Sequence, residues 1–177
     1  MEISNLYSIF LNHPTVTTDS RNIPANSLFF ALKGENFNGN AFAAEALNKG
    51  AAFAVIDESA FVTDDRMILV DNVLLCLQQL ANYHRNQLGL PILAITGTNG
   101  KTTTKELITA VLSKKFKVES TKGNLNNHIG VPLTLLSMTK NTEFGVVEMG
   151  ANHPGEIRTL CEIANPDFGL ITNIGKA

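Results

Sequence analysis

The segment "TGTNGKTTT" at residues 96–104 contains the residue types best suited to chemistry. Gly97 and Gly100 can adopt backbone conformations closed to other residues, so successive amides can turn toward a phosphate at the start of a helix. Lys101 would add a positive charge for the β- and γ-phosphate oxygens, and the Thr102 hydroxyl could ligate Mg²⁺. A plain strand-to-helix turn needs neither the lysine nor three successive threonines, so the segment predicts a nucleotide phosphate site.

This loop departs from the strict phosphate-loop pattern G-x-x-x-x-G-K-[ST]. The position five before Gly100 is Ile95, so the loop begins later, at Gly97. The amides, the lysine and the hydroxyl are nevertheless all present, and we therefore expect the shortened loop to bind ATP. The predicted cofactor-binding residues are Gly97, Thr98, Asn99, Gly100, Lys101, Thr102 and Thr103.

Strands and helices alternate around this loop. The apolar strand predicted at 91–96 leads into a helix predicted at 101–116, with Leu107, Ala110 and Val111 facing inward. Further strands are predicted at 117–121, 144–150 and 168–175, and further helices at 128–138 and 154–164. Near-continuous apolar strands that alternate with helices predict a parallel sheet covered on both faces.

Three polar loops follow the carboxyl ends of these strands, where ligands bind in such sheets. Their sequences are "GTNGKT", "EMGANH" and "TNIGKA", and we expect them to converge on one site. Glu148 stands at a strand end, where its carboxylate could hold Mg²⁺; the residue pattern alone also fits a surface carboxylate. Asn126 and Asn127 precede a predicted helix, where an asparagine most simply caps the helix.

The first ninety residues predict a small mixed α/β unit. Helices are expected at 5–11 and 41–51, and strands at 28–34, 52–57 and 67–71. A helix at 72–88 ends before "GLP", because glycine can cap a helix and proline cannot continue it. The sequence therefore predicts two domains, residues 1–89 and 90–177. Asp19, Ser20 and Arg21 form a polar cluster that reads by itself as a turn.

Composition excludes several classes of function. The formal net charge of -2 gives no electrostatic footprint for nucleic acid or an anionic membrane. No apolar run approaches the ~18 residues of a membrane span, and the N-terminus lacks the features of a signal peptide, so we expect a cytoplasmic protein. Cys76 and Cys161 are predicted to be buried reduced thiols, and His84 to be a packed helix residue rather than a metal ligand.

The "TGTNGKTTT" segment resembles the ATP loop of the Mur ligases and of the related folylpolyglutamate synthetases, which join an amine to a carboxylate at the expense of ATP. The folate enzymes usually read G-K-G-S, so the threonines favour the cell-wall branch of peptidoglycan synthesis. The segments at 17–42, 123–136 and 148–157 look like members that add D-alanyl-D-alanine to UDP-N-acetylmuramoyl-tripeptide. Members that add the third peptide residue usually carry Ser-Ser-His where this chain reads Ala151, Asn152 and His153.

The resemblance assigns roles to the two predicted domains. Residues 1–89 would bind the UDP-substrate, with Ser20 and Arg21 reaching the uracil or the diphosphate and with Lys33 and Asn36 in the same pocket. Residues 90–177 would be the N-terminal part of a central ATP-binding domain.

Within that second domain, Lys101 and Glu148 would be catalytic, and Thr102 and Glu148 would hold Mg²⁺. One of Asn126 and Asn127 would contribute to the substrate or phosphate site. Asn152 and His153 would approach the muramoyl-peptide end of the substrate. A role as general base is a weaker prediction for His153 than this approach to the peptide, since an incoming amine can lose its proton to other groups.

The implied reaction activates a carboxylate as an acyl phosphate, which the amine then attacks, and it needs no protein nucleophile. The chain departs from the family where an Asp-Gly-His run is usual, because it reads Asn38, Gly39 and Asn40. The family's chains are also much longer, with a larger central domain and a third domain. We therefore expect these 177 residues to bind the UDP-substrate without ligating on their own.

Two other functions fit the sequence. The chain could be a non-catalytic module that binds a nucleotide and a UDP-sugar, or a ligase that adds the third peptide residue. A P-loop kinase or GTPase would need a guanine-reading [NT]-K-x-D motif or a lid arginine cluster, and the sequence shows neither.

Overall fold

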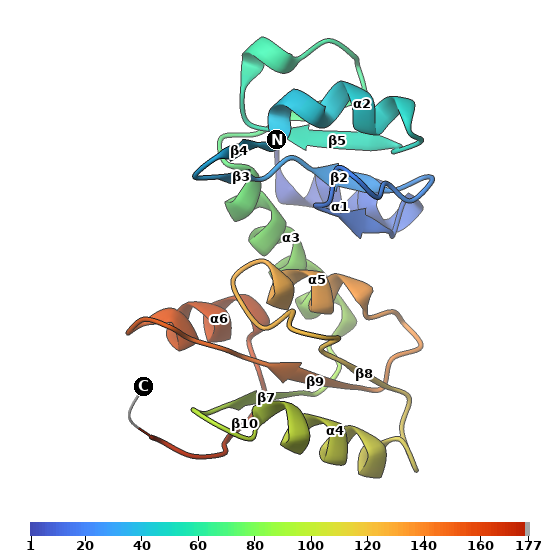
Figure 1. The fold of residues 1–177 in the computed structure, drawn as a ribbon. Helices are drawn as coiled ribbons and strands as arrows, with labels where there is room; N and C mark the ends of the chain where they lie inside the picture. The colour runs from blue at the N-terminus through green and yellow to red at the C-terminus, as the bar shows by residue number, and fades with distance from the viewer. Residues whose placement is uncertain (176–177) are drawn as a thin grey trace. The chain divides into compact units, whose positions relative to one another are not determined.

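The computed structural model describes residues 1–175, which form two compact units (Figure 1). The first unit ends at Leu80 and the second begins at Ala81, inside helix α3 (Val73–Leu88). This division falls earlier than the boundary after Gly89 that the sequence predicts. The reason lies in α3 itself: the amide of Val73 hydrogen-bonds to Asp57 in the first unit, whereas Arg85 bonds to residues of the second.

The first unit is built on a parallel sheet with strand order β1-β2-β5-β6. The strands are β1 (Val16–Thr17), β2 (Leu28–Phe30), β5 (Phe53–Ile56) and β6 (Met67–Leu69). Helices α1 (Ile3–Asn12) and α2 (Ala43–Asn48) accompany them. All three β2 residues are fully buried, which accounts for their unbroken apolar run.

Short elements that the sequence does not predict surround the end of β2. Lys33–Gly34 (β3) and Phe37–Asn38 (β4) form an antiparallel hairpin, so the strand predicted at 28–34 is two strands. A 3-10 helix η1 (Gly39–Phe42) precedes α2, and a second one, η2, spans Ser59–Phe61. A side chain at Gly39 would collide with the backbone of Ala31 and Leu32, so this turn requires glycine.

The second unit contains the parallel sheet that the sequence predicts, with strand order β10-β7-β9-β8. Its strands are β7 (Ile92–Thr96), β8 (Val118–Ser120), β9 (Phe144–Glu148) and β10 (Phe168–Ile171). Helix α4 (Lys101–Leu112) covers one face, whereas α5 (Gly130–Ser137) and α6 (Glu156–Ala164) cover the other (Figure 1). The prediction of an α/β fold covered on both faces is confirmed.

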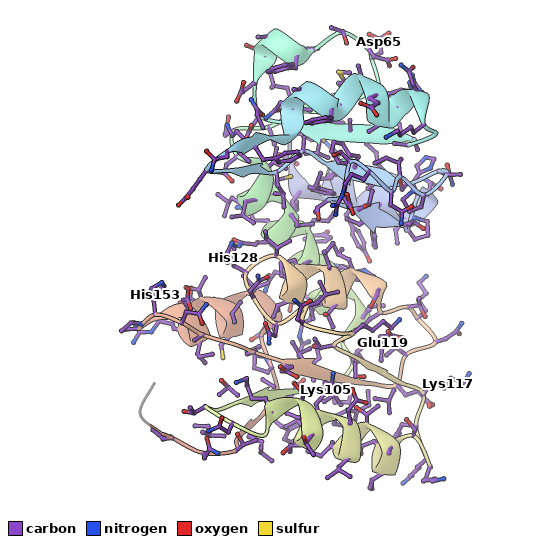
Figure 2. All side chains as sticks on the ribbon, in the orientation of Figure 1. Asp65, Lys105, Lys117, Glu119, His128 and His153 are labelled. Carbon is purple, nitrogen blue, oxygen red and sulfur yellow. The ribbon has the colours of Figure 1, made fainter. Side chains whose placement is uncertain are left out.

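The predicted inward face of α4 is wrong. Leu107 and Val111 are 64% and 71% exposed, and Ala110 is exposed as well. The residue that α4 buries is Lys105, whose Nζ donates to the Thr121 carbonyl at 2.7 Å and pairs with Glu106 at 3.0 Å. Figure 2 shows Lys105 between α4 and the sheet. Helix α4 thus presents Lys105 toward the sheet, and Leu107 and Val111 face outward.

The buried polar residues of α3 secure the second unit. His84 is almost completely buried and its Nε2 lies 2.9 Å from the Met138 carbonyl oxygen, so it is packed as predicted. Arg85 donates to the Ala164 carbonyl and to Asp167, which also accepts the amide of Ile92 at the start of β7.

The two cysteines are free thiols, as predicted. Cys76 is buried, and its burial raises the pKa of the thiol to about 11. Cys161 is only half-buried, so the prediction of full burial is wrong for this residue, whose thiol lies 3.9 Å from the Met149 sulfur. None of the helices in residues 1–175 is long and apolar enough to cross a membrane.

Candidate functional site

The phosphate-loop candidate connects β7 to α4 and depends on its two glycines. Gly97 and Gly100 have φ angles of +141° and +81°, which side chains other than glycine rarely adopt. A Cβ at Gly97 would also collide with the hydroxyl of Thr172. The loop therefore requires glycine at both positions, and it brings the chain directly into the first turn of α4.

Lys101 folds back over this loop. Its Nζ donates to the Gly97 carbonyl at 2.6 Å and to the Thr98 carbonyl at 3.3 Å. Thr102 and Thr103 follow with exposed side chains, and no described side chain caps the start of α4. Free first-turn amides beside a lysine and a hydroxyl form a favourable environment for a phosphate.

The loop after β10 binds the phosphate-loop candidate from the side. The Asn99 amide donates to Asn173 Oδ1 at 3.0 Å, and the Thr98 amide donates to the Asn173 carbonyl at 3.2 Å. Thr172 in turn donates to the Asn99 carbonyl at 2.6 Å. Two amides predicted to face phosphate are thus engaged by Asn173. The last two residues of the "TNIGKA" loop lie outside the described part of the chain.

Glu148, at the end of β9, is 2% exposed, and its two carboxylate oxygens differ. Oε1 accepts a hydrogen bond from the Asn126 side-chain amide at 2.9 Å, whereas Oε2 is buried and has no partner among the described residues. A buried carboxylate oxygen without a donor is costly unless a cation occupies the space beside it. The donor set fits Mg²⁺, which prefers a carboxylate and a hydroxyl and otherwise retains water or phosphate ligands.

A metal site made of protein side chains alone would need several ligands close together. Within residues 1–175, no group of three or more His, Cys, Asp or Glu side chains is placed to hold a metal ion. Magnesium would therefore depend on Glu148, Thr102 and the phosphates of a nucleotide, as is usual for this ion.

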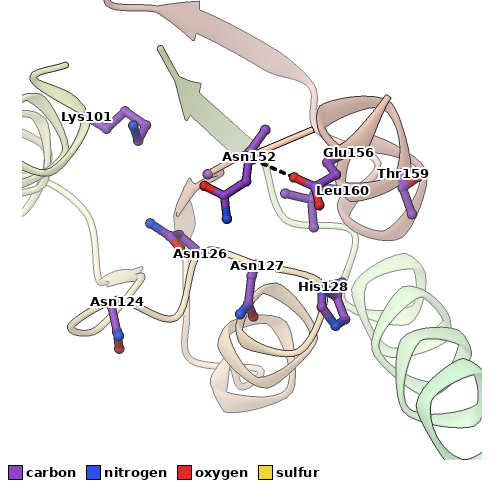
Figure 3. A pocket seen from close by; sticks show the side chains of 11 residues that line it. Lys101, Asn124, Asn126, Asn127, His128, Asn152, Glu156, Thr159 and Leu160 are labelled. Carbon is purple, nitrogen blue, oxygen red and sulfur yellow. Dashed lines mark hydrogen bonds between the residues drawn. The ribbon is translucent and has the colours of Figure 1, made fainter. Parts of the chain in front are cut away.

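A cavity of about 560 Å³ opens beside Lys101 (Figure 3). Its walls are the segment before α5, which contributes Asn126 and Asn127, and the turn between β9 and α6, which contributes Asn152. The structure thus brings four predicted site residues to one cavity, while His153 is not among the residues that line it.

The two asparagines before α5 have different partners. Asn126 bonds to Glu148, and its carbonyl accepts the amide of Gly150 at 2.8 Å. Asn127 Oδ1 accepts the amides of Ile129 and Gly130 at 3.1 and 2.9 Å, which orders the start of α5. Asn126 is therefore tied to the candidate metal ligand, and Asn127 to the helix.

Glu156 is a cavity residue that sequence reasoning missed. Its Oε2 accepts the amides of Asn152 at 2.6 Å and of His153 at 3.0 Å, and these hydrogen bonds lower the pKa of Glu156. Glu156 is the first residue of α6 and Gly155 is its N-cap, so the Ser/Thr-x-x-Glu spacing of a capping box is absent and no local motif marks this role in the sequence. Asn124, His128 and Thr159 also line the cavity without having been predicted.

In the first unit, Ser20 and Arg21 line a shallow hollow of about 600 Å³ together with Phe37 and Phe42. The two phenylalanine rings are stacked with centroids 5.3 Å apart. Arg21 forms a two-point ion pair with Asp19, at 2.8 and 3.0 Å, and this pair lowers the pKa of Asp19 to about 2. A stacking platform beside an arginine suits a flat ring and a phosphate.

Lys33 and Asn36 do not line that hollow. Asn36 is exposed, and Lys33 Nζ pairs with Asp57 at 3.0 Å and with Glu58 at 3.3 Å, which raises the pKa of Lys33. Asn40, in place of the histidine usual in the resembling family, is buried and exchanges two hydrogen bonds of 2.9 Å with Asp57.

Comparisons with known proteins identify the family of the chain. The model of the Mur ligase family catalytic domain matches residues 14–126, and that of the Mur ligase middle domain matches residues 95–177. The UDP-N-acetylmuramoyl-tripeptide--D-alanyl-D-alanine ligase of Bacillus subtilis (strain 168) is 47% identical over 164 residues. That alignment covers 92% of this chain and 36% of the relative, so the chain spans about a third of the relative's length.

Solved structures of ligases from the same family are also similar to this chain. The UDP-N-acetylmuramoylalanyl-D-glutamyl-2,6-diaminopimelate--D-alanyl-D-alanyl ligase of Acinetobacter baumannii superposes with a TM-score of 0.85 and 39% identity, over 92% of this chain and 36% of that one. The MurF ligase of Thermotoga maritima in complex with ADP superposes with a TM-score of 0.84 and 36% identity, over 94% of this chain and 39% of that one.

Proposed function

The chain belongs to the Mur ligase family, and from that premise we propose that it forms the UDP-substrate-binding and ATP-binding part of a cytoplasmic carbon–nitrogen ligase. The complete reaction would add D-alanyl-D-alanine to UDP-N-acetylmuramoyl-tripeptide at the expense of ATP, as the name of the Bacillus subtilis relative describes. Two observations carry the proposal: Lys101 lines the cavity, and the cavity residue Asn126 holds the buried carboxylate of Glu148, whose second oxygen has no partner among the described residues.

ATP would bind at the loop of residues 97–103. The Thermotoga maritima relative was solved in complex with ADP, which supports the presence of a nucleotide site in a chain of this family. The Lys101 ammonium, now held by two loop carbonyls, would exchange these for β- and γ-phosphate oxygens. The free amides at the start of α4 would bind the same phosphates.

The chemistry places two anions together. The terminal carboxylate of the tripeptide attacks the γ-phosphorus, the bond from phosphorus to the bridging oxygen of ADP breaks, and an acyl phosphate and ADP result. The amine of D-alanyl-D-alanine then attacks the carbonyl carbon, releases inorganic phosphate and loses its proton. Lys101 and the loop amides offset the negative charge that this approach concentrates.

Mg²⁺, when bound, would neutralise further phosphate charge, and Thr102 and Glu148 are the residues that would hold it. Asn126 would keep the Glu148 carboxylate in one orientation through its hydrogen bond to Oε1. Asn152 and His153 would approach the peptide. The Glu156 carboxylate would keep their backbone in place through its hydrogen bonds to the two amides.

In the first unit, the hollow that contains Arg21 and the stacked Phe37 and Phe42 rings would receive the uridine diphosphate. Ser20 would add a hydroxyl to this pocket. Lys33 and Asn36 remain candidates at its margin, but Lys33 would have to leave Asp57 and Glu58 to reach a phosphate.

A calorimetric titration of Lys101→Ala tests the proposal. We expect the variant to bind a non-hydrolysable ATP analogue about a hundredfold more weakly in Mg²⁺, because it lacks charge-assisted hydrogen bonds to phosphate. Affinity for UDP-N-acetylmuramoyl-tripeptide should stay unchanged. Lys114→Ala, at an exposed position just after α4, is the matched control and should bind both ligands normally.

Two results would contradict the proposal. One is failure of the unmodified chain to bind either ligand. The other is a loss of UDP-substrate affinity in Lys101→Ala as large as the loss of nucleotide affinity, since the two sites would then not be separate.

A further inference from the structure

The end of the cavity away from Lys101 carries groups that neither phosphate nor magnesium needs. Figure 3 shows Lys101 at one end and His128, Glu156 and Thr159 at the other, with Asn152 between them. A carboxylate at this far end would repel a phosphate, so a different chemical group must account for it.

Glu156 is fixed in place with one oxygen available. Its Oε2 accepts both amides of the turn before α6, at 2.6 and 3.0 Å, whereas Oε1 has no hydrogen bond within the described residues. The amide hydrogen bonds also favour the ionised form, because they lower the pKa of Glu156. The side chain is half-buried, so its charge is only partly screened by water.

The surroundings of Glu156 suit a cation on an apolar stem. The almost fully buried Leu160 also lines this end, as does Thr159, whose hydroxyl can accept a hydrogen bond. An apolar wall, a hydroxyl and one fixed carboxylate are the features that bind a flexible aminoalkyl chain, whose methylene groups pack while the ammonium pairs.

We propose that this end of the cavity, around Glu156, is a subsite for a primary ammonium group of the ligase substrates. The inference rests on the proposed function, which places the reacting carboxylate near Lys101. The Acinetobacter baumannii relative is named for a substrate that ends in diaminopimelate, a residue whose side chain carries an amine. That side chain would extend from the reacting carboxylate into the cavity, whose volume of about 560 Å³ can contain it.

Two substrates bear the required amine: the third residue of the acceptor peptide and the incoming D-alanyl-D-alanine. The experiment therefore measures each separately, on the intact chain, by calorimetry at pH 8, where an ordinary histidine is neutral. The acceptor is prepared as the UDP-muramoyl-tripeptide ending in lysine and as its Nε-acetyl derivative, which has the same stem without the charge.

The informative variant is Glu156→Gln, because the glutamine carbonyl can still accept the Asn152 and His153 amides while the charge is lost. Unchanged NMR shifts of these two amides would show that the turn is intact. We expect affinity for the lysine peptide to fall about tenfold and affinity for the acetylated peptide to change less than about twofold. Glu162→Gln, an exposed position on the same helix, should change neither affinity.

The outcomes separate the subsite from the proposed function. Equal weakening of both peptides, or weakening of neither peptide and no change with D-alanyl-D-alanine, would overturn the ammonium subsite. A loss confined to D-alanyl-D-alanine would also overturn the subsite as placed, because the incoming amine has to reach the reacting carbonyl near Lys101 and not the far end of the cavity. If the unmodified chain bound no UDP-peptide at all, the proposed function would fail first and the subsite with it.

Discussion

Asp57 and Glu148 occupy equivalent places in the two units. Glu148 ends β9 and Asp57 directly follows β5, so each is a carboxylate at the carboxyl end of a buried parallel strand. Glu148 as a whole residue is 2% exposed, and the side chain of Asp57 is 6% exposed. The equivalence ends with their partners: Asp57 accepts from Asn40, Lys33 and the Val73 amide, whereas one oxygen of Glu148 has none among the described residues.

This difference separates a carboxylate that the fold uses from one that it keeps available. Asp57 joins the β3–β4 hairpin, β5 and the start of α3, and no oxygen of it is left for a ligand. Glu148 is held by Asn126 at one oxygen only. Burial and position in the sheet are alike, so the completeness of the hydrogen bonding is what distinguishes a structural carboxylate from a candidate ligand.

The largest expected effect comes from substituting each of these two carboxylates by its amide. Asp57→Asn should lower the free energy of unfolding of the first unit by about 2 to 3 kcal/mol, because an amide nitrogen in place of one carboxylate oxygen leaves the Asn40 or Val73 donor without an acceptor. Glu148→Gln should change the stability of the second unit by less than about 1 kcal/mol, since it removes an incompletely paired buried charge. Urea denaturation followed by NMR of each unit measures both.

In ligand binding, the order of the two variants should be the opposite: Glu148→Gln should have the larger effect. We expect Glu148→Gln to lose the Mg²⁺ dependence of binding to the ATP analogue and Asp57→Asn to retain it. A strongly destabilised Glu148→Gln with normal Mg²⁺ dependence would show that Glu148 is another structural carboxylate.

The pH dependence of Asp57 follows from its contacts. Burial opposes ionisation, but the hydrogen bonds from Asn40 and Lys33 outweigh it, so the pKa of Asp57 is lowered. A carboxyl group whose pKa is lower in the folded state stabilises the fold above its unfolded pKa, and this contribution is lost as the pH falls through the folded value. The Asp57→Asn variant should therefore differ least from the unmodified chain in acid.

Much of the second unit could be predicted from sequence because its signals are local. The apolar runs predict the strands, and the glycines and Lys101 stand next to one another in the chain. Glu148 could be selected from its place after "FGVV". In each case the evidence lies within a few residues of the position predicted.

The residues that were missed depend on distant partners. Lys105 reads as a surface lysine of a helix, and its burial depends on a 2.7 Å hydrogen bond to the carbonyl of Thr121, a distant residue in the chain. The face of α4 could not be predicted for the same reason, since two stripes fit the helical period. The β3–β4 hairpin has only two residues in each strand, which is too short for a periodic pattern.

A smaller effect on stability is expected when the pH is lowered, because the buried His84 belongs to the second unit. Burial lowers the pKa of His84, so the folded second unit favours the neutral ring. The stabilisation is present above the unfolded pKa and is lost as the pH falls through the lower folded value. When the pH is lowered from 7.5 to 5.5, hydrogen-exchange protection factors, which correct for the slower intrinsic exchange in acid, should fall more in residues 81–175 than in the first unit.

His84→Gln provides the control for this measurement, because its amide can still donate to the Met138 carbonyl without titrating. The difference between the two units should shrink in this variant. A loss of protection of equal size in both units, or a difference that persists in His84→Gln, would assign the acid sensitivity to other groups.

The smallest effect is expected for Leu107→Ala on the exposed face of α4. Leu107 is 64% exposed, so truncation removes little buried surface, and alanine is the better helix former; the free energy of unfolding should change by less than about 0.5 kcal/mol. Leu47→Ala in α2 of the first unit makes the same chemical change at a residue that is 4% exposed, and it should cost about 2 to 4 kcal/mol. Denaturation of both variants tests whether the two units differ as the burial pattern indicates: a loss above about 2 kcal/mol in Leu107→Ala would mean that α4 packs through its apolar stripe and not through Lys105.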